Sequence, residues 1–198
     1  MLFNSVLFLF FFAAVYFVYW SLSARPRQYF LIGASILFYA AWGLEREGLV
    51  GLRWTLHFFG IAVLNYYLIN WMLDLPERKR SIIALIVTID LINLGIFKYT
   101  LFFRDVLLDF GLPVPEQTKE WSIFLPLAIS FYTFQIMAYA IDVYRGVIAE
   151  RIGLRKFLLF IMFFPQLIAG PIMRSTDFLP QIEKPMLVQA FSAEAAVE

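Results

Sequence analysis

A series of long apolar runs, separated by short charged connections, most constrains what this chain can fold into. An apolar run of about 20 residues forms a helix long enough to cross the ~30 Å hydrocarbon core of a bilayer. The composition agrees, because 62% of the residues are hydrophobic and 16% are charged, whereas soluble domains average about 45–50% and about 25%. The sequence therefore predicts an all-α polytopic membrane protein with about six transmembrane or re-entrant helices, over residues 1–24, 28–44, 54–73, 81–103, 121–141 and 157–173.

The composition also excludes several kinds of site. The chain has no cysteine, so a disulfide, a thiolate metal site and a cysteine nucleophile are all excluded. The single histidine, His57, excludes a site that needs two imidazoles. The net charge is +1 and no basic cluster alternates with aromatic residues, so no nucleic-acid partner is expected. We predict no bound metal and no bound cofactor, and the lipid bilayer as a partner.

Polar residues form a stripe along the run at 121–141. Tyr132, Gln135, Tyr139 and Asp142 fall at i, i+3, i+7 and i+10, which places them on one face of a helix. Lipid does not hydrogen-bond such side chains, so this face is expected to look into a polar interior and to line a channel or substrate tunnel. The alternative is that the stripe only joins helices, because Tyr and Gln often form interhelical hydrogen bonds.

The run at 157–173 is predicted to be a complete span or a broken half-span. Pro165 and Gln166 lie inside it and Gly170 with Pro171 closes it, and proline removes a backbone donor and kinks a helix. Broken backbone in a membrane needs protein or a water-filled cavity to satisfy its polar groups. Gln166 and the following Arg174 are therefore predicted to line the same channel, whereas Phe160 is expected to face lipid.

Two ionisable residues lie within the run at 81–103. Asp90 is near its middle, and Lys98 follows eight residues later on roughly the same face. An ionisable group inside a membrane indicates function by default, and Asp90 is expected to be protonated or paired with a downstream residue. Lys98 can instead extend its ammonium group to the membrane surface. His57 is interpreted as a structural or interfacial residue.

The basic residues indicate how the chain is oriented. Connections with an excess of Lys and Arg lie in the cytoplasm, and the tighter basic clusters are at 25–27, 78–80 and 145–156. This pattern places the N-terminus outside the cell and these three connections inside. Residues 1–185 are expected to form one part of a membrane domain, and 186–198 to begin an unfinished helix or a truncated tail.

Several motifs carry a family resemblance. The chain resembles the membrane-bound O-acyltransferase family, in the bacterial branch of the alginate O-acetyltransferase membrane protein and the D-alanyl transferase of teichoic acid synthesis. The match runs from residue 1 to about residue 184, and two long motifs in the right order make it specific. The residues that carry it are 1–5 (MLFNS), 93–99, 130–135 (SFYTFQ), Tyr139, 141–146 (IDVYRG), 163–172 (FFPQLIAGPI), Arg174 and 177–181 (DFLPQ).

The resemblance implies a fold and an activity. Such proteins form a ring of helices around a thin waist, in the bacterial inner membrane. A thioester donor such as acetyl-CoA or an acyl carrier protein binds on the cytoplasmic side. An exported polysaccharide, or a partner acyltransferase, takes the acyl group outside. The family's catalytic histidine lies in the second half of a longer protein, and His57 does not match it. The resemblance therefore implies the N-terminal part of an O-acetyltransferase, without a catalytic residue and inactive alone.

Two other interpretations remain open from the sequence. Broken helices and an intramembrane Asp90 also suit a polytopic transporter or a scaffold without covalent chemistry. The chain could also be a truncated, inactive product that needs a partner chain to cover its polar stripe.

Overall fold

The computed structural model describes residues 6–112, 125–169 and 173–183, and every regular element in these parts is helical. The predicted all-α class is therefore confirmed for them. The predicted helix from residue 186 and the boundary at 185 lie outside the described residues. The elements are α1 (Val6–Ser21), α2 (Ala24–Glu47), η1 (Gly48–Gly51), α3 (Leu52–Asp74), η2 (Pro76–Arg78), α4 (Lys79–Asp109), α5 (Ile129–Tyr144), α6 (Leu154–Met162), α7 (Phe164–Ala169) and α8 (Ser175–Glu183).

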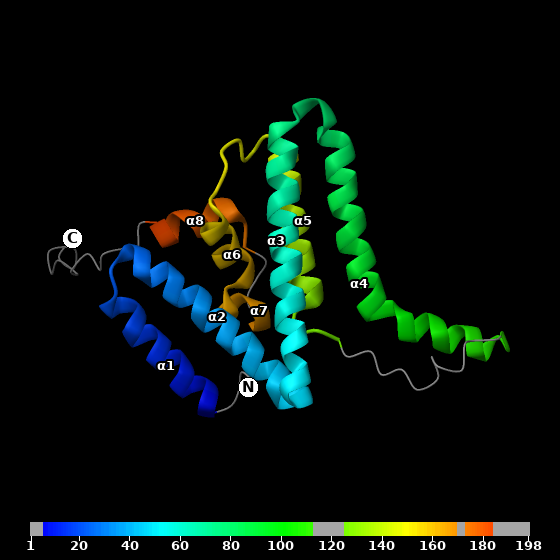
Figure 1. Cartoon of the computed structure of the whole chain (residues 1–198), viewed down its shortest axis with the longest axis horizontal. Coiled ribbons are helices and arrows are strands. Elements are labelled where there is room, and N and C mark those ends of the chain that lie inside the picture. Colours follow the sequence, from blue (N-terminus) through cyan, green and yellow to red (C-terminus); the bar gives the residue numbers. More distant parts are fainter. Residues whose placement is uncertain (1–5, 113–124, 170–172, 184–198) are drawn as a thin grey trace, which may run out of the picture.

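The long helices form two antiparallel pairs with the short helices packed between them (Figure 1). α1 packs against α2, and α2 passes through η1 into α3. α3 and α4 form a hairpin that turns at η2, and α5 packs against both of them. α6 lies between α2 and α3 and contacts both, while α7 packs on α2 and α8 on α6. The short helices α6 to α8 thus occupy the interior between the pairs.

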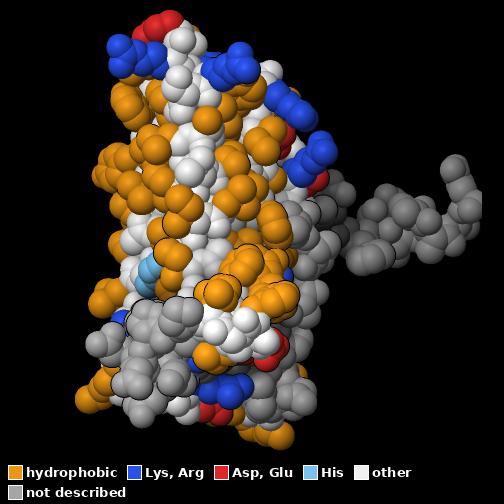
Figure 2. Space-filling view, turned by 90° about the vertical axis from the view of Figure 1, so that its right-hand side faces the viewer, with side chains coloured by type: hydrophobic (Ala, Val, Ile, Leu, Met, Phe, Trp, Pro, Cys, Tyr) orange, Lys and Arg blue, Asp and Glu red, His pale blue; other side chains and the backbone are white. Residues whose placement is uncertain are grey.

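Within the described residues, two helical stretches are long and apolar enough to cross a membrane, judged by length and composition. They are Arg25–Asp74, which runs through α2, η1 and α3, and Pro76–Asp109, which runs through η2 and α4. α1 is apolar but has only 16 residues. Figure 2 shows hydrophobic side chains over the middle of the α4 side, with Lys and Arg gathered at its upper end. The length and apolar composition of these helices suggest a membrane protein, while the count of six spans and the helical ring stay predictions.

Two glycines make the corner between α2 and α3. A β-carbon on Gly43 would lie 2.5 Å from the carbonyl oxygen of Gly51, and one on Gly51 would overlap the Gly43 backbone in turn. Gly48, between them, has a φ of 61°, a conformation that L-residues rarely adopt. The close contact lets α2 reverse into α3 within the four residues of η1.

Aromatic side chains hold α2, α3 and α5 together. Tyr39, Phe58 and Tyr132 are fully buried. The ring of Phe58 lies 4.9 Å from that of Tyr39 and 4.3 Å from that of Tyr132. The Tyr39 hydroxyl donates to the Leu127 carbonyl at 3.0 Å, just before α5. This stack fixes the start of α5 against α2 and α3.

Two expectations about local structure need correction. The fifth helix was expected over 121–141, but α5 begins only at Ile129, after Pro126 and after Ala128 with a φ of 57°; residues 121–124 lie outside the described parts. Phe160 was expected to face lipid, and that is wrong, because its side chain is 1% exposed. It packs between Tyr139 and Phe178, since α6 runs through the interior.

Candidate functional site

The sixth apolar run is a broken helix, as one of the two predictions for it stated. α6 ends at Met162, and Phe163 has a ψ of 105° that is not helical. α7 starts at Phe164, so that Pro165 lies in a first turn, where a missing backbone N–H does no harm. The backbone N–H of Phe164 donates to the buried Ser35 hydroxyl at 3.2 Å. The protein interior thus satisfies the donor exposed by the break, as a membrane-embedded break requires.

Two glutamine side chains bridge α5 to this break. The Gln135 amide nitrogen donates to the Phe160 carbonyl at 3.0 Å and to the Gln166 side-chain oxygen at 3.1 Å. Both glutamines are at most 5% exposed. The Phe160 carbonyl belongs to the last turn of α6, where it lacks an intrahelical partner. Gln135 therefore ties the end of α6 and the start of α7 to α5; we call this contact the amide bridge.

Beside the amide bridge lies a polar cavity of about 330 Å³ between α5, α6 and the start of α8. Arg174 and Arg145 supply positive charge to its wall, Asp142 a carboxylate, and Ser175 a buried hydroxyl without a partner among the described residues. The described lining contains amide, hydroxyl, carboxylate and guanidinium groups, and no imidazole. It can hold an anionic or thioester-bearing ligand, and Asp142 is the one carboxylate on its described lining. The residues that line it are Gln135, Ala138, Tyr139, Ile141, Asp142, Arg145, Phe160, Met173, Arg174 and Ser175.

The structure brings most of the predicted channel residues together. Gln135, Tyr139, Asp142 and Arg174 all line this one cavity. Gln166 joins them through the amide bridge. Tyr132 lies apart, with its ring stacked on Phe58 in the core. Their role in a channel stays a prediction.

A second buried polar cluster lies between α3, α4 and α5. The Asn65 amide donates to the Asp90 carboxylate at 2.8 Å, and both side chains are almost completely buried. Asp90 is thus paired with a residue that precedes it, rather than with a downstream one. Asn93, one turn further along α4, neighbours both Tyr132 and His57. We call the Asn65–Asp90 contact the clasp.

Lys98 and His57 do not join a site with Asp90. Lys98 is exposed, with its ammonium group 5.5 Å from the ring centre of Tyr99, so it lies off the buried face that carries Asp90. His57 is half-buried, and its ring lies 5.0 Å from that of Phe97. In the described parts of the chain, no group of three or more His, Cys, Asp or Glu is placed to hold a metal ion.

Sequence reasoning missed several residues that shape these sites. Ser35 and Asn65 are uncharged polar side chains inside apolar runs. Such residues in a membrane helix usually bond to another helix, so this signal could have identified them. Ser175 follows the predicted Arg174 directly, but no pattern distinguishes it from a surface serine.

The chain is similar to known bacterial proteins over most of its length. Two of them, from Pseudomonas aeruginosa and Azotobacter vinelandii, are both named probable alginate O-acetylase AlgI. Each is 36% identical over an alignment of 189 positions that covers 91% of this chain. A peptidoglycan O-acetyltransferase of Helicobacter pylori is 33% identical over an alignment of 217 positions, gaps included, that covers 92% of the chain. These relatives confirm the resemblance to O-acetylating acyltransferases of the membrane-bound O-acyltransferase type.

The chain spans about a third of the length of these relatives, since the matches cover 34%, 36% and 39% of them. No family model matches the chain. No solved structure matches it either. The similarity therefore rests on the sequence relatives, and the activity of the whole protein is a matter for proposal.

Proposed function

We propose that this chain forms part of an acyltransferase in the bacterial inner membrane. The complete enzyme transfers an acetyl group from a cytoplasmic thioester to a hydroxyl of an exported polysaccharide, or to a partner acyltransferase. The names of the relatives support acetyl transfer in general. The basic clusters support the side of the donor, because the connections at 25–27, 78–80 and 145–156 would lie in the cytoplasm.

The reaction is an exchange of esters at one carbonyl carbon. The acceptor oxygen attacks the thioester carbonyl, so a C–O bond forms while the C–S bond breaks. The sulfur leaves as a thiolate, and the hydroxyl proton passes to a base. The carbonyl oxygen carries negative charge in the transition state and needs fixed hydrogen-bond donors.

The Gln166 amide nitrogen is buried and has no partner among the described residues, while the side-chain oxygen of Gln166 is already held by Gln135 in the amide bridge. Leaving a buried donor unsatisfied costs about 1–3 kcal/mol, and a ligand in the adjoining space could satisfy this one. We propose that Gln166 donates to the thioester carbonyl oxygen as charge develops there.

The polar cavity beside the amide bridge suits the donor molecule. Arg174 and Arg145 would attract the phosphates of acetyl-CoA or of a carrier's phosphopantetheine arm, because guanidinium groups bind phosphate through two bonds. Asp142 lies on the same wall and would orient the arginines. Tyr139, whose ring meets that of Phe157 edge-on with 5.4 Å between the ring centres, also lines the cavity.

The base is proposed to come from outside these 198 residues, because neither the cavity nor the matched motifs supply an imidazole, the base that enzymes use most often for a hydroxyl. Acetyl transfer by the purified 198-residue chain, abolished by His57→Ala, would overturn this part of the proposal. The transporter or scaffold interpretation is the alternative. It predicts that the purified complete protein never cleaves a thioester in the presence of an acceptor.

The amide bridge gives the test. In cells that make the complete protein, Gln166→Ala should lower ester-linked acetyl on the exported polymer at least tenfold, or about 1.4 kcal/mol of transition-state stabilisation. Phe134→Ala is the matched control, since Phe134 precedes Gln135 in the sequence but is 45% exposed. Membrane levels of each variant are measured by immunoblot. Equal acetylation by both variants at equal levels would contradict the role of Gln166.

A further inference from the structure

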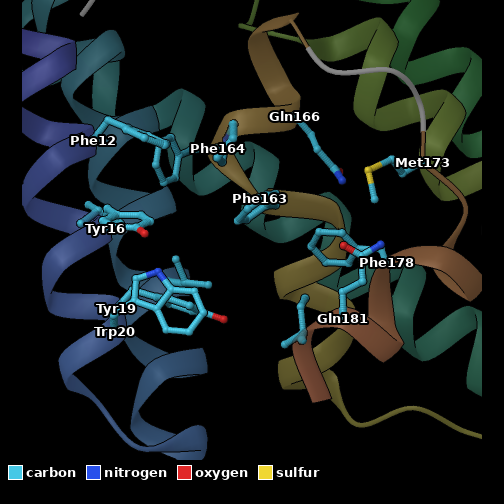
Figure 3. A pocket seen from close by; sticks show the side chains of 14 residues that line it. Phe12, Tyr16, Tyr19, Trp20, Phe163, Phe164, Gln166, Met173, Phe178 and Gln181 are labelled. Atoms are coloured by element: carbon cyan, nitrogen blue, oxygen red, sulfur yellow. The ribbon is translucent and has the colours of Figure 1, made fainter. Parts of the chain in front are cut away.

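A groove lies between α1 on one side and α7 and α8 on the other (Figure 3). Its volume is about 360 Å³, which falls within the range of about 300–1,000 Å³ found for small-molecule sites. Figure 3 shows the aromatic side chains of α1 facing Phe163, Phe164 and Phe178 across the space. The groove is lined by Phe12, Val15, Tyr16, Tyr19, Trp20, Leu31, Phe163, Phe164, Pro165, Gln166, Met173, Phe178, Gln181 and Ile182. We call it the aromatic groove.

The aromatic groove is separate from the polar cavity but adjoins it. Met173 lines both spaces, and Gln166 of the amide bridge forms part of the groove wall. The lining of the groove is mainly aromatic and aliphatic, and its other polar groups come from tyrosine, tryptophan and glutamine. The part of a ligand that lies in the groove is therefore expected to be uncharged, flexible and apolar.

A cation lies at one end of the groove. The guanidinium of Arg27 is 4.6 Å from the ring centre of Tyr19 and 5.1 Å from that of Trp20, and both rings line the groove. Its Nε donates to the Tyr19 carbonyl at 2.9 Å. The bond and the two rings hold the charge in place at the corner between α1 and α2. Among the described residues, nothing bonds to its two terminal nitrogens.

The charge on this corner is not balanced nearby in the sequence. Residues 1–44 contain no Asp or Glu, and Arg25 adds a second, exposed cation two residues before Arg27. In the parts of the chain that the structure describes, neither arginine forms an ion pair. The corner thus presents fixed positive charge to whatever occupies the end of the groove.

We propose that the aromatic groove binds one anionic phospholipid, with an acyl chain between α1 and α8 and the phosphate on Arg27. A chain of methylene groups matches the aromatic lining, and a phosphate matches a planar, fixed guanidinium. The outer face of α1 is itself apolar, with Leu9, Phe10 and Phe17 each more than 60% exposed. The groove therefore opens beside a face suited to lipid, and its basic corner distinguishes anionic from zwitterionic headgroups.

The site does not depend on the proposed acetyl transfer. The test is native mass spectrometry of the complete protein, released from nanodiscs that contain equal amounts of phosphatidylglycerol and phosphatidylcholine. One phosphatidylglycerol should remain bound, and Arg27→Gln should lower its retention at least fivefold. Arg27→Lys, which keeps the charge, should lower it less. Arg46→Gln is the matched control, because Arg46 lies exposed at the other end of the same helix.

Equal retention of the two lipids, or an equal loss in the Arg46 control, would overturn the proposal. A second measurement identifies the occupant directly. Tyr16→Cys introduces the only cysteine among these 198 residues, and a photo-crosslinker on it reports what fills the groove. A phospholipid adduct supports the proposal. An adduct to another segment of the protein, or to a second copy of the chain, overturns it, as does displacement of the signal by free glycerol phosphate.

Discussion

Two buried contacts in this molecule each consist of a side-chain amide that donates to a side chain on another helix, but their surroundings differ. The clasp joins Asn65 on α3 to Asp90 on α4, two long unbroken helices. The amide bridge joins Gln135 on α5 to Gln166, where the backbone between α6 and α7 is broken. The bridge adjoins both the polar cavity and the aromatic groove, whereas neither Asn65 nor Asp90 lines either space.

The difference shows that a buried polar residue in a membrane helix does not identify a site by itself. The clasp gives α3 and α4 a specific contact, and helices in lipid depend on such contacts because the hydrophobic effect does not drive their association. Both contacts leave buried polar atoms without a partner among the described residues, but only the amide bridge lies at a broken helix and beside a cavity. Those additional features, rather than polarity, separate a binding surface from a structural contact.

The largest effect on stability is expected from removing one side of the clasp. Asp90→Leu removes one of the two acceptors of the Asn65 amide and leaves it only the Ile61 carbonyl, at 3.1 Å. An unsatisfied buried N–H should cost about 1–3 kcal/mol. Thermal unfolding in detergent, followed by size-exclusion fluorescence, measures the loss. Asp90→Asn, which can still accept from Asn65, is the control and should lose less. Acetylation per folded molecule should stay unchanged, and a tenfold loss of it in Asp90→Asn would break the comparison.

A smaller effect is expected when both sides of the clasp become apolar. The double variant Asn65→Leu, Asp90→Leu leaves no unsatisfied partner within the pair, and such replacements are often close to neutral. Its unfolding midpoint should therefore lie above that of Asp90→Leu alone. A midpoint below that of the single variant would show that the clasp residues also support other side chains, for example Tyr132 and Asn93 beside Asp90.

The smallest effect is expected at an exposed contact. Arg151 in the connection after α5 pairs with Asp74 at the end of α3, and each side chain is about half exposed, at 53% and 52%. Exposed ion pairs contribute about 0–1 kcal/mol, so Arg151→Gln should shift the unfolding midpoint by less than Asp90→Leu does. The shift should vanish at high salt, and a larger, salt-independent loss would contradict a simple surface pair.

The sequence could predict the helical class, the broken sixth run and most of the polar cavity. Period and polarity suffice for these, because Tyr139 and Asp142 must share a helix face with Gln135. It could not predict the path of α6 through the interior. Phe160 has the composition of a lipid-facing residue, and only the packing of α6 between α2 and α3 buries it.

Pairings between distant helices were also beyond the sequence. Asp90 was expected to be protonated or to pair with a downstream residue, and the hairpin between α3 and α4 brings it to Asn65, which precedes it. Such pairings depend on the rotation of each helix about its axis, which packing decides. Likewise, Arg27 was recognised only as a marker of orientation, and its place over two rings of α1 emerges from the tight turn after Ser21.

The break after α6 also has an electrical consequence. A nine-residue helix spans about 14 Å at 1.5 Å per residue, roughly half of a ~30 Å hydrocarbon core. If water reaches the break from one side, the membrane voltage falls over that shorter distance. Moving a unit charge through 100 mV takes about 2.3 kcal/mol of work. A neutral acetyl group incurs none of it, so an enzyme built on such a break can leave the charged carrier in the cytoplasm and pass only the acyl group.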